Sequence, residues 1–309
     1  MNIFITGANG FIGKHLLYDL IKKTNFNIFI LVKKKKKSLN LEKIFYTNRV
    51  HITYGNYDDL DKLKEIISRC ELICNLGFPS KLKFKNDFKK KKYLISLRNI
   101  LSILRKKNHF KLVHISSSEV YGFKKITNKI SYAENVKTLP QNSYGKAKLE
   151  AENLILKSDL KIIKNTIILR LFNVYGIGQT NKTIINVIIR KLSLNKKRVK
   201  LKNIYDERDY IFLNDVIDAI RYSLLSKNIY GVYNVSTGKT ISVKNIFKVI
   251  KDIIGRNEVK LLDSKNLKYS NFSCGKNLKI RKRIGWKPKH SSIESFKKNI
   301  KKMFIYKNN

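Results

Sequence analysis

Over the first 172 residues, short apolar runs alternate with longer segments in which apolar residues recur every three or four positions. Such runs predict buried strands, and such periodic segments predict amphipathic helices. The predicted strands cover residues 2–6, 27–32, 50–54, 71–76, 110–115 and 162–172. Four helices are predicted. The first begins at residue 10, the second covers 59–69, the third ends near residue 107, and the fourth covers 139–152. Strands that alternate with helices in this way predict an α/β fold with a Rossmann-type, doubly wound parallel sheet.

The pattern after residue 172 is more mixed. It predicts a helix over 183–194, another helix after the segment 208–216, a helix over 242–254, and an amphipathic helix at the end of the chain. No internal repeat and no linker rich in Gly, Ser or Pro separates the two parts. We therefore predict a large domain over residues 1–172 and a smaller mixed α/β lobe over 173–309, partly interleaved with the first domain.

A glycine-rich turn joins the first predicted strand to the first helix. Gly7 allows a tight turn, Gly10 lets the backbone approach a pyrophosphate, and Gly13 lets the helix pack closely on the strand. A diphosphate would lie at the helix N-terminus, where unpaired N–H groups and the helix dipole favour negative charge. Because a strand precedes the turn and a helix follows it, the spacing predicts a dinucleotide-binding unit rather than only a structural turn.

The end of the second predicted strand bears on the choice between NAD and NADP. An acidic residue normally stands there and binds the adenosine ribose hydroxyls. Here Val32 is followed by Lys33, the first residue of the lysine run 33–37. A cation at this place favours the 2′-phosphate of NADP, whereas a solvated lysine loop is the equally supported alternative. The sequence therefore predicts NAD or NADP as the cofactor and leaves the choice open.

Tyr144 and Lys148 stand four residues apart on the predicted helix 139–152, so they share one face of it. Free tyrosine has a pKa of about 10 and is a poor base at neutral pH. A nearby ammonium group and a positive nicotinamide ring favour the phenolate and lower that pKa toward the working range of a general base. The pair is therefore a candidate catalytic pair, with two helix-surface residues as the alternative.

These features together resemble the extended short-chain dehydrogenase/reductase family of nucleotide-sugar epimerases and dehydratases. The matching motifs are the Thr-Gly-x-x-Gly-x-x-Gly spacing at residues 6–13, the serine run before Val120-Tyr121-Gly122, and the Tyr-x-x-x-Lys pair. The resemblance reaches the Gly-Trp-Lys-Pro run at 285–288. It implies a dinucleotide-binding first domain and a substrate-binding second lobe, and it is more specific for the superfamily than for the reaction.

The resemblance also implies roles for individual residues. Ser117 would bind the reacting sugar hydroxyl, Tyr144 would be the general base, and Lys148 would hydrogen-bond the nicotinamide ribose. The implied cofactor-binding residues are Gly7, Asn9, Gly10, Phe11, Ile12, Gly13, Lys33, Leu76, Gly77, Tyr144 and Lys148.

Glu119 follows Ser117 by two residues, so on an extended strand end both side chains point the same way. Related decarboxylases and 4,6-dehydratases carry a Ser/Thr-x-Glu pattern here and use the glutamate as a base. Dehydratases of the dTDP-glucose type have Asp where this chain has Ser118. Glu119 is therefore a candidate catalytic residue, with a packing or hydrogen-bonding role as the alternative.

The resemblance further implies that Asn173 and Arg208 bind the diphosphate of a nucleotide sugar. An asparagine amide can donate to a phosphate oxygen, and an arginine can engage phosphate with two hydrogen bonds. The alternatives are a strand-end turn residue and a solvated arginine. The Arg-Pro-Gly-Asp run usual in the C-terminal lobe of the family is absent, with Lys268 as a candidate substitute, so the identity of the substrate stays open.

The chain is strongly basic, with 66 Lys and Arg against 22 Asp and Glu and a formal net charge of +44. Such an excess can indicate nucleic acid or an anionic membrane surface as partner. The lysines are spread along the whole chain and no nucleic-acid motif accompanies them, so we predict no specific nucleic-acid partner. Three cysteines and five histidines show no metal-ligand spacing, and no metal is predicted.

No apolar run approaches the length of a membrane span, and residue 7 is already glycine, which argues against a secretory signal. We therefore predict a cytoplasmic protein without a membrane partner. The predicted function is an NAD(P)-dependent nucleotide-sugar epimerase, acting at C4 through a transient keto-sugar, and the predicted assembly is a homodimer.

Three alternatives stay open. The chain could be a nucleotide 4-keto-sugar reductase, or a nucleotide-sugar 4,6-dehydratase or decarboxylase that uses Glu119. It could also be a cofactor-binding regulator without turnover. The presence of Ser117, Tyr144 and Lys148 argues against the regulator, because a sensor has no need of them.

Overall fold

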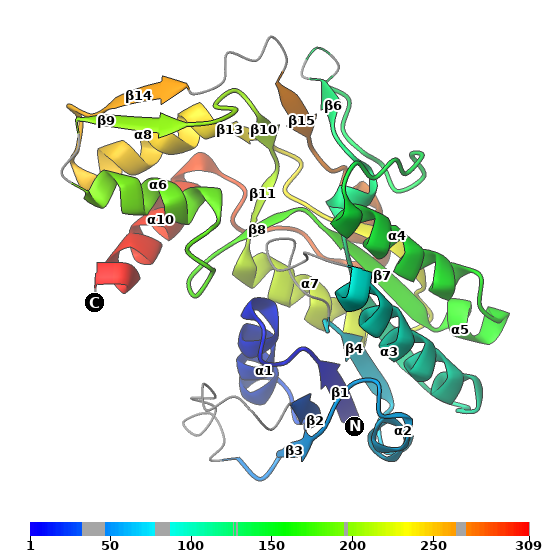
Figure 1. Cartoon of the computed structure of the whole chain (residues 1–309). Helices are drawn as coiled ribbons and strands as arrows, with labels where there is room; N and C mark the ends of the chain where they lie inside the picture. The colour runs from blue at the N-terminus through cyan, green and yellow to red at the C-terminus, as the bar shows by residue number, and fades with distance from the viewer. Residues whose placement is uncertain are drawn as a thin grey trace.

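The computed structural model describes residues 1–32, 47–77, 87–125, 127, 129–194, 197–263 and 270–308. Its centre is a sheet of seven parallel strands in the order β12-β7-β5-β4-β1-β2-β3 (Figure 1). The strands are β1 (Asn2–Thr6), β2 (Asn27–Val32), β3 (Val50–Tyr54), β4 (Leu72–Asn75), β5 (Lys111–Ser117), β7 (Thr166–Leu171) and β12 (Gly231–Val235). This sheet confirms the predicted Rossmann-type fold. The strand order reverses between β1 and β4, and such sheets bind ligands beyond the carboxyl ends of the strands at this point.

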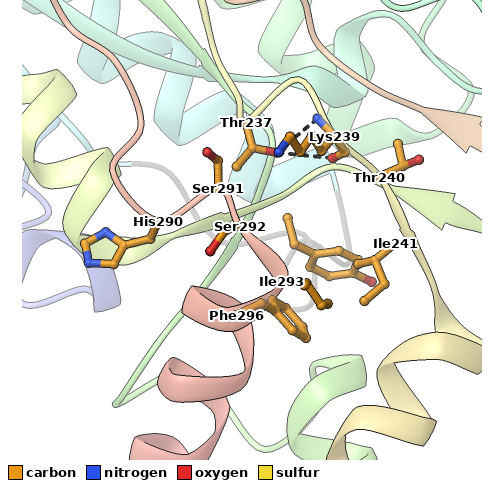
Figure 2. A pocket seen from close by; sticks show the side chains of 10 residues that line it. Thr237, Lys239, Thr240, Ile241, His290, Ser291, Ser292, Ile293 and Phe296 are labelled. Atoms are coloured by element: carbon orange, nitrogen blue, oxygen red, sulfur yellow. Dashed lines mark hydrogen bonds between the residues drawn. The ribbon is translucent and has the colours of Figure 1, made fainter.

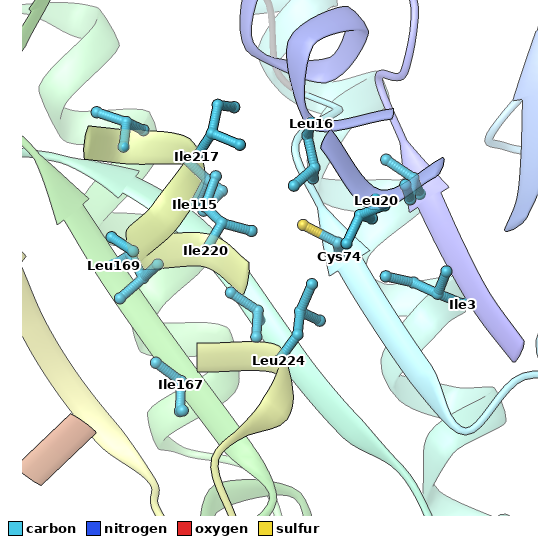
Figure 3. Close-up of a cluster of buried hydrophobic side chains, with 14 of the residues drawn as sticks. Ile3, Leu16, Leu20, Cys74, Ile115, Ile167, Leu169, Ile217, Ile220 and Leu224 are labelled. Atoms are coloured by element: carbon cyan, nitrogen blue, oxygen red, sulfur yellow. The ribbon is translucent and has the colours of Figure 1, made fainter. Parts of the chain in front are cut away.

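Helices cover both faces of the sheet (Figure 1). One face carries α1 (Phe11–Lys23) and α7 (Leu213–Leu225), and the other carries α2 (Leu60–Ser68), α3 (Asp87–Arg105), α4 (Ser143–Leu156) and α5 (Leu160–Lys164). Leu16 of α1 and Ile220 of α7 belong to one buried cluster with strand residues such as Ile115 (Figure 3). Both faces of the central strands are therefore buried, which explains why these strands appear in the sequence as continuous apolar runs.

A smaller lobe follows the large sheet. Its strands are β6 (Lys124–Lys125), β8 (Asn173–Tyr175), β9 (Arg198–Leu201), β10 (Glu207–Arg208), β11 (Tyr210–Phe212), β13 (Ile241–Ser242), β14 (Lys260–Asp263) and β15 (Asn271–Ser273). Its helices are α6 (Ile184–Ser193), α8 (Val243–Ile254), α9 (Leu278–Ile284) and α10 (Ile293–Asn308). α6, α8 and α10 share an apolar cluster that includes Ile188, Ile246 and Ile300. This cluster gives the lobe a core of its own.

The two parts of the chain are interleaved. After β8 and the lobe strands β9–β11, the chain returns as α7 and β12, and β12 pairs in parallel with β7 at the edge of the large sheet. It then leaves again for the lobe strand β13. The boundary between residues 172 and 173 stays a prediction.

Two predicted elements begin four residues later in the structure than expected. The predicted strand 162–172 begins only at Thr166, because Ile162 belongs to α5, where its N–H donates to the Asp159 carbonyl and its side chain is buried against α3. The predicted helix 139–152 begins only at Ser143. Asn142 caps it, since its side chain accepts a hydrogen bond from the Gly145 N–H.

Candidate active site

The turn between β1 and α1 depends on its glycines. Gly7 has a φ of +68°, a conformation that favours glycine, and its carbonyl oxygen accepts a hydrogen bond from the Gly10 N–H at 2.9 Å. A Cβ on Gly13 would lie 2.2 Å from the same carbonyl oxygen. The helix can therefore approach the strand this closely only without a side chain at Gly13. We call residues 7–13 the glycine turn.

The first turn of α1 offers amides to an anion. α1 begins at Phe11, and its N-cap residue Gly10 has no side chain with which to bond them. The first N–H groups of a helix have no partner within the helix, and the helix dipole adds positive potential. Asn9, Phe11 and Ile12, which were predicted to bind the cofactor, lie at this place and are partly exposed. The residues present therefore fit the diphosphate of a dinucleotide.

The turn after β4 lies directly against the glycine turn. Thr6 Oγ1 donates to Asn75 Oδ1 at 2.7 Å and accepts from the Gly77 N–H at 2.8 Å. A Cβ on Gly7 would lie 3.0 Å from Gly77 Cα and 3.0 Å from the carbonyl oxygen of Leu76. The structure thus brings Gly7, Leu76 and Gly77, all predicted to bind the cofactor, to the point where the strand order reverses.

Tyr57 is a contact of the glycine turn that the sequence did not reveal. Its hydroxyl donates to the Leu31 carbonyl at 2.7 Å and accepts from the Gly7 N–H at 2.9 Å. Burial raises the pKa of Tyr57 to about 12, so the phenol keeps its proton at neutral pH. The Tyr57 hydroxyl therefore links the glycine turn to the end of β2 through these two hydrogen bonds. Lys33, the residue predicted to favour NADP, follows β2 but lies outside the described residues, as does Lys268.

Ser117, Tyr144 and Lys148 meet at the carboxyl end of β5. Ser117 is the last residue of β5, and Tyr144 lies in the first turn of α4 and hydrogen-bonds to Ser117. Lys148, one turn later and 3% exposed, donates from Nζ to the Ile115 carbonyl at 2.7 Å. We call Ser116–Glu119 together with Asn142–Lys148 the β5–α4 corner.

Burial dominates the electrostatics of this pair. It raises the pKa of Tyr144 above its ordinary value, against the opposing effect of the Ser117 hydrogen bond and with the help of the Glu119 charge. It also lowers the pKa of Lys148 to about 7, while the charge of Glu152 acts in the opposite direction. Within the chain itself, the tyrosine pKa is therefore raised and not lowered as the sequence led us to expect, because loss of solvent outweighs the favourable hydrogen bond.

A buried ion pair supports the corner from below. Arg170 on β7 donates hydrogen bonds to the Glu152 carboxylate of α4. Its Nε lies 3.1 Å from Oε1 and 3.2 Å from Oε2, and its Nη2 lies 2.6 Å from Oε2. Ser116 Oγ also donates to Glu152, and Arg170 Nη1 donates to the Tyr121 hydroxyl at 2.8 Å. That hydroxyl donates to Asn234 Oδ1 at 2.8 Å on β12. The network connects α4 to three strands of the sheet.

A second buried chain of hydrogen bonds runs from the cofactor turns toward Lys148. Asn75 Nδ2 lies 3.2 Å from His114 Nδ1, and His114 Nε2 lies 3.3 Å from the Tyr93 hydroxyl. Lys148 Nζ lies 5.5 Å from the centre of the Tyr93 ring. Burial, and after it the charge of Lys148, lower the pKa of His114 well below its ordinary value. The imidazole is therefore neutral at neutral pH.

Glu119 lies in the short 3₁₀ turn Ser118–Val120 that follows β5. Its N–H donates to Ser117 Oγ at 3.2 Å, and its carboxylate Oε2 accepts from Asn142 Nδ2 at 2.6 Å. The structure thus places Glu119 beside Ser117 and at the beginning of α4.

Asn173 and Arg208 lie in the smaller lobe. Asn173 pairs with Tyr210 between β8 and β11, and its Nδ2 donates to the Asp209 carbonyl at 3.0 Å. The Arg208 guanidinium lies 3.8 Å from the centre of the Phe123 ring, and its Nη2 donates to Asp206 Oδ2 at 2.9 Å. Its Nη1 is buried without a hydrogen-bond partner among the described residues. A buried donor left unpaired is costly, so this group is suited to an anionic ligand.

Asp209 holds these residues in place and was not found from the sequence. Its buried carboxylate accepts from Thr237 Oγ1 at 2.7 Å and from the backbone N–H groups of Thr237 and Gly238, each at 2.9 Å. Burial raises the pKa of Asp209 to about 6 in spite of these bonds. Asp209 therefore connects the strand that carries Arg208 to the turn after β12.

A cavity of about 120 Å³ in the smaller lobe is lined by Tyr210 and by residues that include Ile241 and Phe296 (Figure 2). Its lining is rich in hydroxyl groups, among them Thr240, Ser291 and Ser292, and it also includes Lys239. It contains none of Ser117, Tyr144 and Lys148. We therefore place the chemistry at the β5–α4 corner and not in this cavity.

Two features are absent from the part of the chain that the structure describes. Among these residues, no three His, Cys, Asp or Glu side chains gather as they would around a metal ion. No described helix combines the length and the apolar character needed to cross a membrane.

The chain is similar to proteins named for their action on nucleotide sugars. A family model, that of the NAD dependent epimerase/dehydratase family, matches residues 3–236. A Methanocaldococcus jannaschii protein provisionally named UDP-glucose 4-epimerase is 28% identical, over 96% of this chain and 97% of that protein. The Escherichia coli dTDP-4-dehydro-6-deoxyglucose reductase is 26% identical, over 81% of this chain and 80% of its own. The solved structure of Thermotoga maritima UDP-glucose 4-epimerase with UDP-glucose covers 100% of this chain and 99% of its own, at 23% identity and a TM-score of 0.81.

Proposed function

We propose, from the premise that this chain belongs to the NAD dependent epimerase/dehydratase family, that it is a nucleotide-sugar epimerase acting at C4. Membership confirms the predicted family and the predicted nicotinamide dinucleotide cofactor. The observation that carries the reaction is the meeting of Ser117, Tyr144 and Lys148 at the end of β5. This corner lies on the same sheet edge as the glycine turn, so a dinucleotide whose diphosphate lies at the glycine turn would place its nicotinamide end toward a sugar bound at the corner.

The glycine turn and the first amides of α1 would hold the cofactor diphosphate. Gly77 and Lys148 would lie at the nicotinamide ribose. When bound, the nicotinamide supplies reversible acceptance of a hydride from the sugar carbon. The choice between NAD and NADP stays open, because the residues after β2 that bear on it lie outside the described part of the chain.

Tyr144 would take the proton of the sugar hydroxyl at its phenol oxygen and return it to the same sugar oxygen once the sugar presents its other face. Ser117 Oγ, hydrogen-bonded to Tyr144, would orient that hydroxyl. A protonated Lys148 stabilises the phenolate through its positive charge. Acid–base catalysis of this kind contributes about 10²–10⁴-fold to the rate.

The nucleotide diphosphate would bind at Arg208 and Asn173. The buried and unpaired Nη1 of Arg208 supports this placement, because a phosphate oxygen would satisfy it with a charge-assisted hydrogen bond. The pairing of Tyr210 with Asn173 and the hydrogen bond from Asn173 to the Asp209 carbonyl fix the chain directly after Arg208. The particular sugar and base stay open.

The test is incubation of the purified protein with a panel of nucleotide sugars, followed by mass spectrometry and separation of isomers. A C4 epimer of unchanged mass is the expected product. Loss of water indicates a dehydratase, loss of carbon dioxide a decarboxylase, and a gain of two hydrogens a reductase. Any of these three results would replace the epimerase assignment.

We also propose a homodimer located in the cytoplasm. Light scattering coupled to size exclusion separates a dimer from a monomer of 36.2 kDa, and cell fractionation tests the location.

A further inference from the structure

Glu119 lies where the end of β5 touches the first turn of α4. Its Oε2 accepts a hydrogen bond from Asn142 Nδ2 at 2.6 Å, and Asn142 Oδ1 accepts from the Gly145 N–H at 2.8 Å. The two backbones are also in close contact, since a Cβ on Gly145 would lie 2.5 Å from the Glu119 carbonyl oxygen. The carboxylate is therefore connected to the helix start through a single side chain.

The Asn142 side-chain amide carries a nitrogen and an oxygen with opposite hydrogen-bonding roles, so its contact with Glu119 determines how the amide is oriented. Its nitrogen can only donate and its oxygen can only accept. A carboxylate can only accept, so Glu119 requires the Asn142 nitrogen and turns the amide oxygen toward the Gly145 N–H. That oxygen is the N-cap of α4, two residues before Tyr144. Glu119 thus selects the orientation in which Asn142 caps the helix.

The same residue holds the other partner of Tyr144. The Glu119 N–H donates to Ser117 Oγ at 3.2 Å, and Ser117 hydrogen-bonds to Tyr144. A ring of hydrogen bonds therefore runs from Ser117 through Glu119 and Asn142 to the first turn of α4, and returns from Tyr144 to Ser117. The ring includes Ser117 and Tyr144, the two residues proposed to contact the sugar hydroxyl.

We propose that Glu119, acting through Asn142, is a positioning residue that fixes Tyr144 against Ser117, and that it is not the base of an elimination. The inference rests on the proposed function, and it explains how a chain with the Ser-x-Glu pattern can carry out epimerisation. To take up a proton at Oε2, Glu119 would have to give up the charge-assisted hydrogen bond from Asn142.

Variants that exchange donors and acceptors test this role. E119Q keeps an acceptor oxygen for Asn142 and should retain most of kcat. E119A and N142A remove the contact and should lower kcat by about tenfold or more, since small displacements of reacting groups have effects of this order. N142D places two carboxylates against each other and should be impaired. E119Q/N142D reverses the hydrogen bond, because the amide introduced at position 119 can donate to the carboxylate introduced at position 142, and it should restore the rate.

A second measurement needs no substrate. Amide hydrogen exchange at residues 144–147 should become faster in E119A and N142A than in the wild type, and should return toward the wild-type rate in E119Q/N142D. This measurement decides the proposal even if no nucleotide sugar is turned over, a result that would refute only the proposed function. An inactive E119Q beside an active N142A, or unchanged exchange in E119A, would overturn the positioning role.

Discussion

The glycine turn and the β5–α4 corner lie at the same edge of the sheet, but they are held in different ways. The glycine turn is held by backbone sterics, since a Cβ on Gly13 would lie 2.2 Å from the Gly7 carbonyl oxygen. The corner is held mainly by side chains, with Glu152 and Arg170 buried beneath it and Asn142 and Glu119 hydrogen-bonded within it. A position where a Cβ would clash with the backbone accepts few residue types, whereas a hydrogen-bonded side-chain network can be formed by many combinations of residues. The glycine turn can therefore be recognised by spacing, whereas the side-chain contacts that hold the corner are seen only in the structure.

The largest expected effect comes from the group that carries the proton. Y144F should lower the turnover of the nucleotide sugar by about 10²–10⁴-fold, because only the phenolic oxygen that moves the proton is removed. Cofactor affinity, measured by titration of the cofactor-free protein, should stay close to that of the wild type, since the glycine turn is unchanged. A Y144F protein that keeps more than about a tenth of the wild-type rate would show that Tyr144 is not the base.

The ion pair below the corner should matter more for stability than any single contact of the glycine turn. In R170M the Glu152 carboxylate stays buried without its cation, and breaking such a pair costs about 3–5 kcal/mol of unfolding free energy. Urea unfolding measures this loss. The double variant E152Q/R170M leaves no buried charge in the pair and should be more stable than R170M. Equal stability of the two would contradict the electrostatic origin of the loss.

This contrast explains what could be predicted from the sequence. The glycine turn, the alternating strands and the Tyr144–Lys148 pair depend on neighbours within a few residues, so spacing was sufficient to find them. The hydrogen bond from Tyr121 to Asn234 joins residues 113 positions apart, and no local pattern marks it. Ile162 shows the same limit within an element, because its apolar character fitted a strand equally well. Its backbone hydrogen bond to the Asp159 carbonyl and its packing against α3 assign it to a helix.

A smaller effect should separate the glycines from one another. G13A should destabilise the protein by about 1–3 kcal/mol, because the added methyl group has to displace backbone atoms. G10A is the matched control, since its Cβ would lie 3.1 Å from the Gly7 carbonyl oxygen, where a small shift suffices. Thermal unfolding compares the two variants. A G10A loss as large as that of G13A would mean that the turn is not held by this one contact.

The smallest effect is a pH trend that the corner should show and the glycine turn, which has no ionisable group, should not. Burial lowers the pKa of Lys148 from 10.5 to about 7. Between these values the unfolded chain binds a proton that the folded chain does not, so the contribution of Lys148 to stability rises with pH, by about 1 kcal/mol per pH unit.

The variant K148M removes this ionisable group. Its stability relative to the wild type should therefore fall steadily from pH 7 to pH 9, by roughly that slope, and should stay level below pH 7. K146M changes an exposed lysine on the same helix and should show a constant difference over this range. If K148M and the wild type differ by the same amount at every pH, Lys148 keeps its proton when the protein folds, and the buried corner then holds a permanent positive charge beside Tyr144.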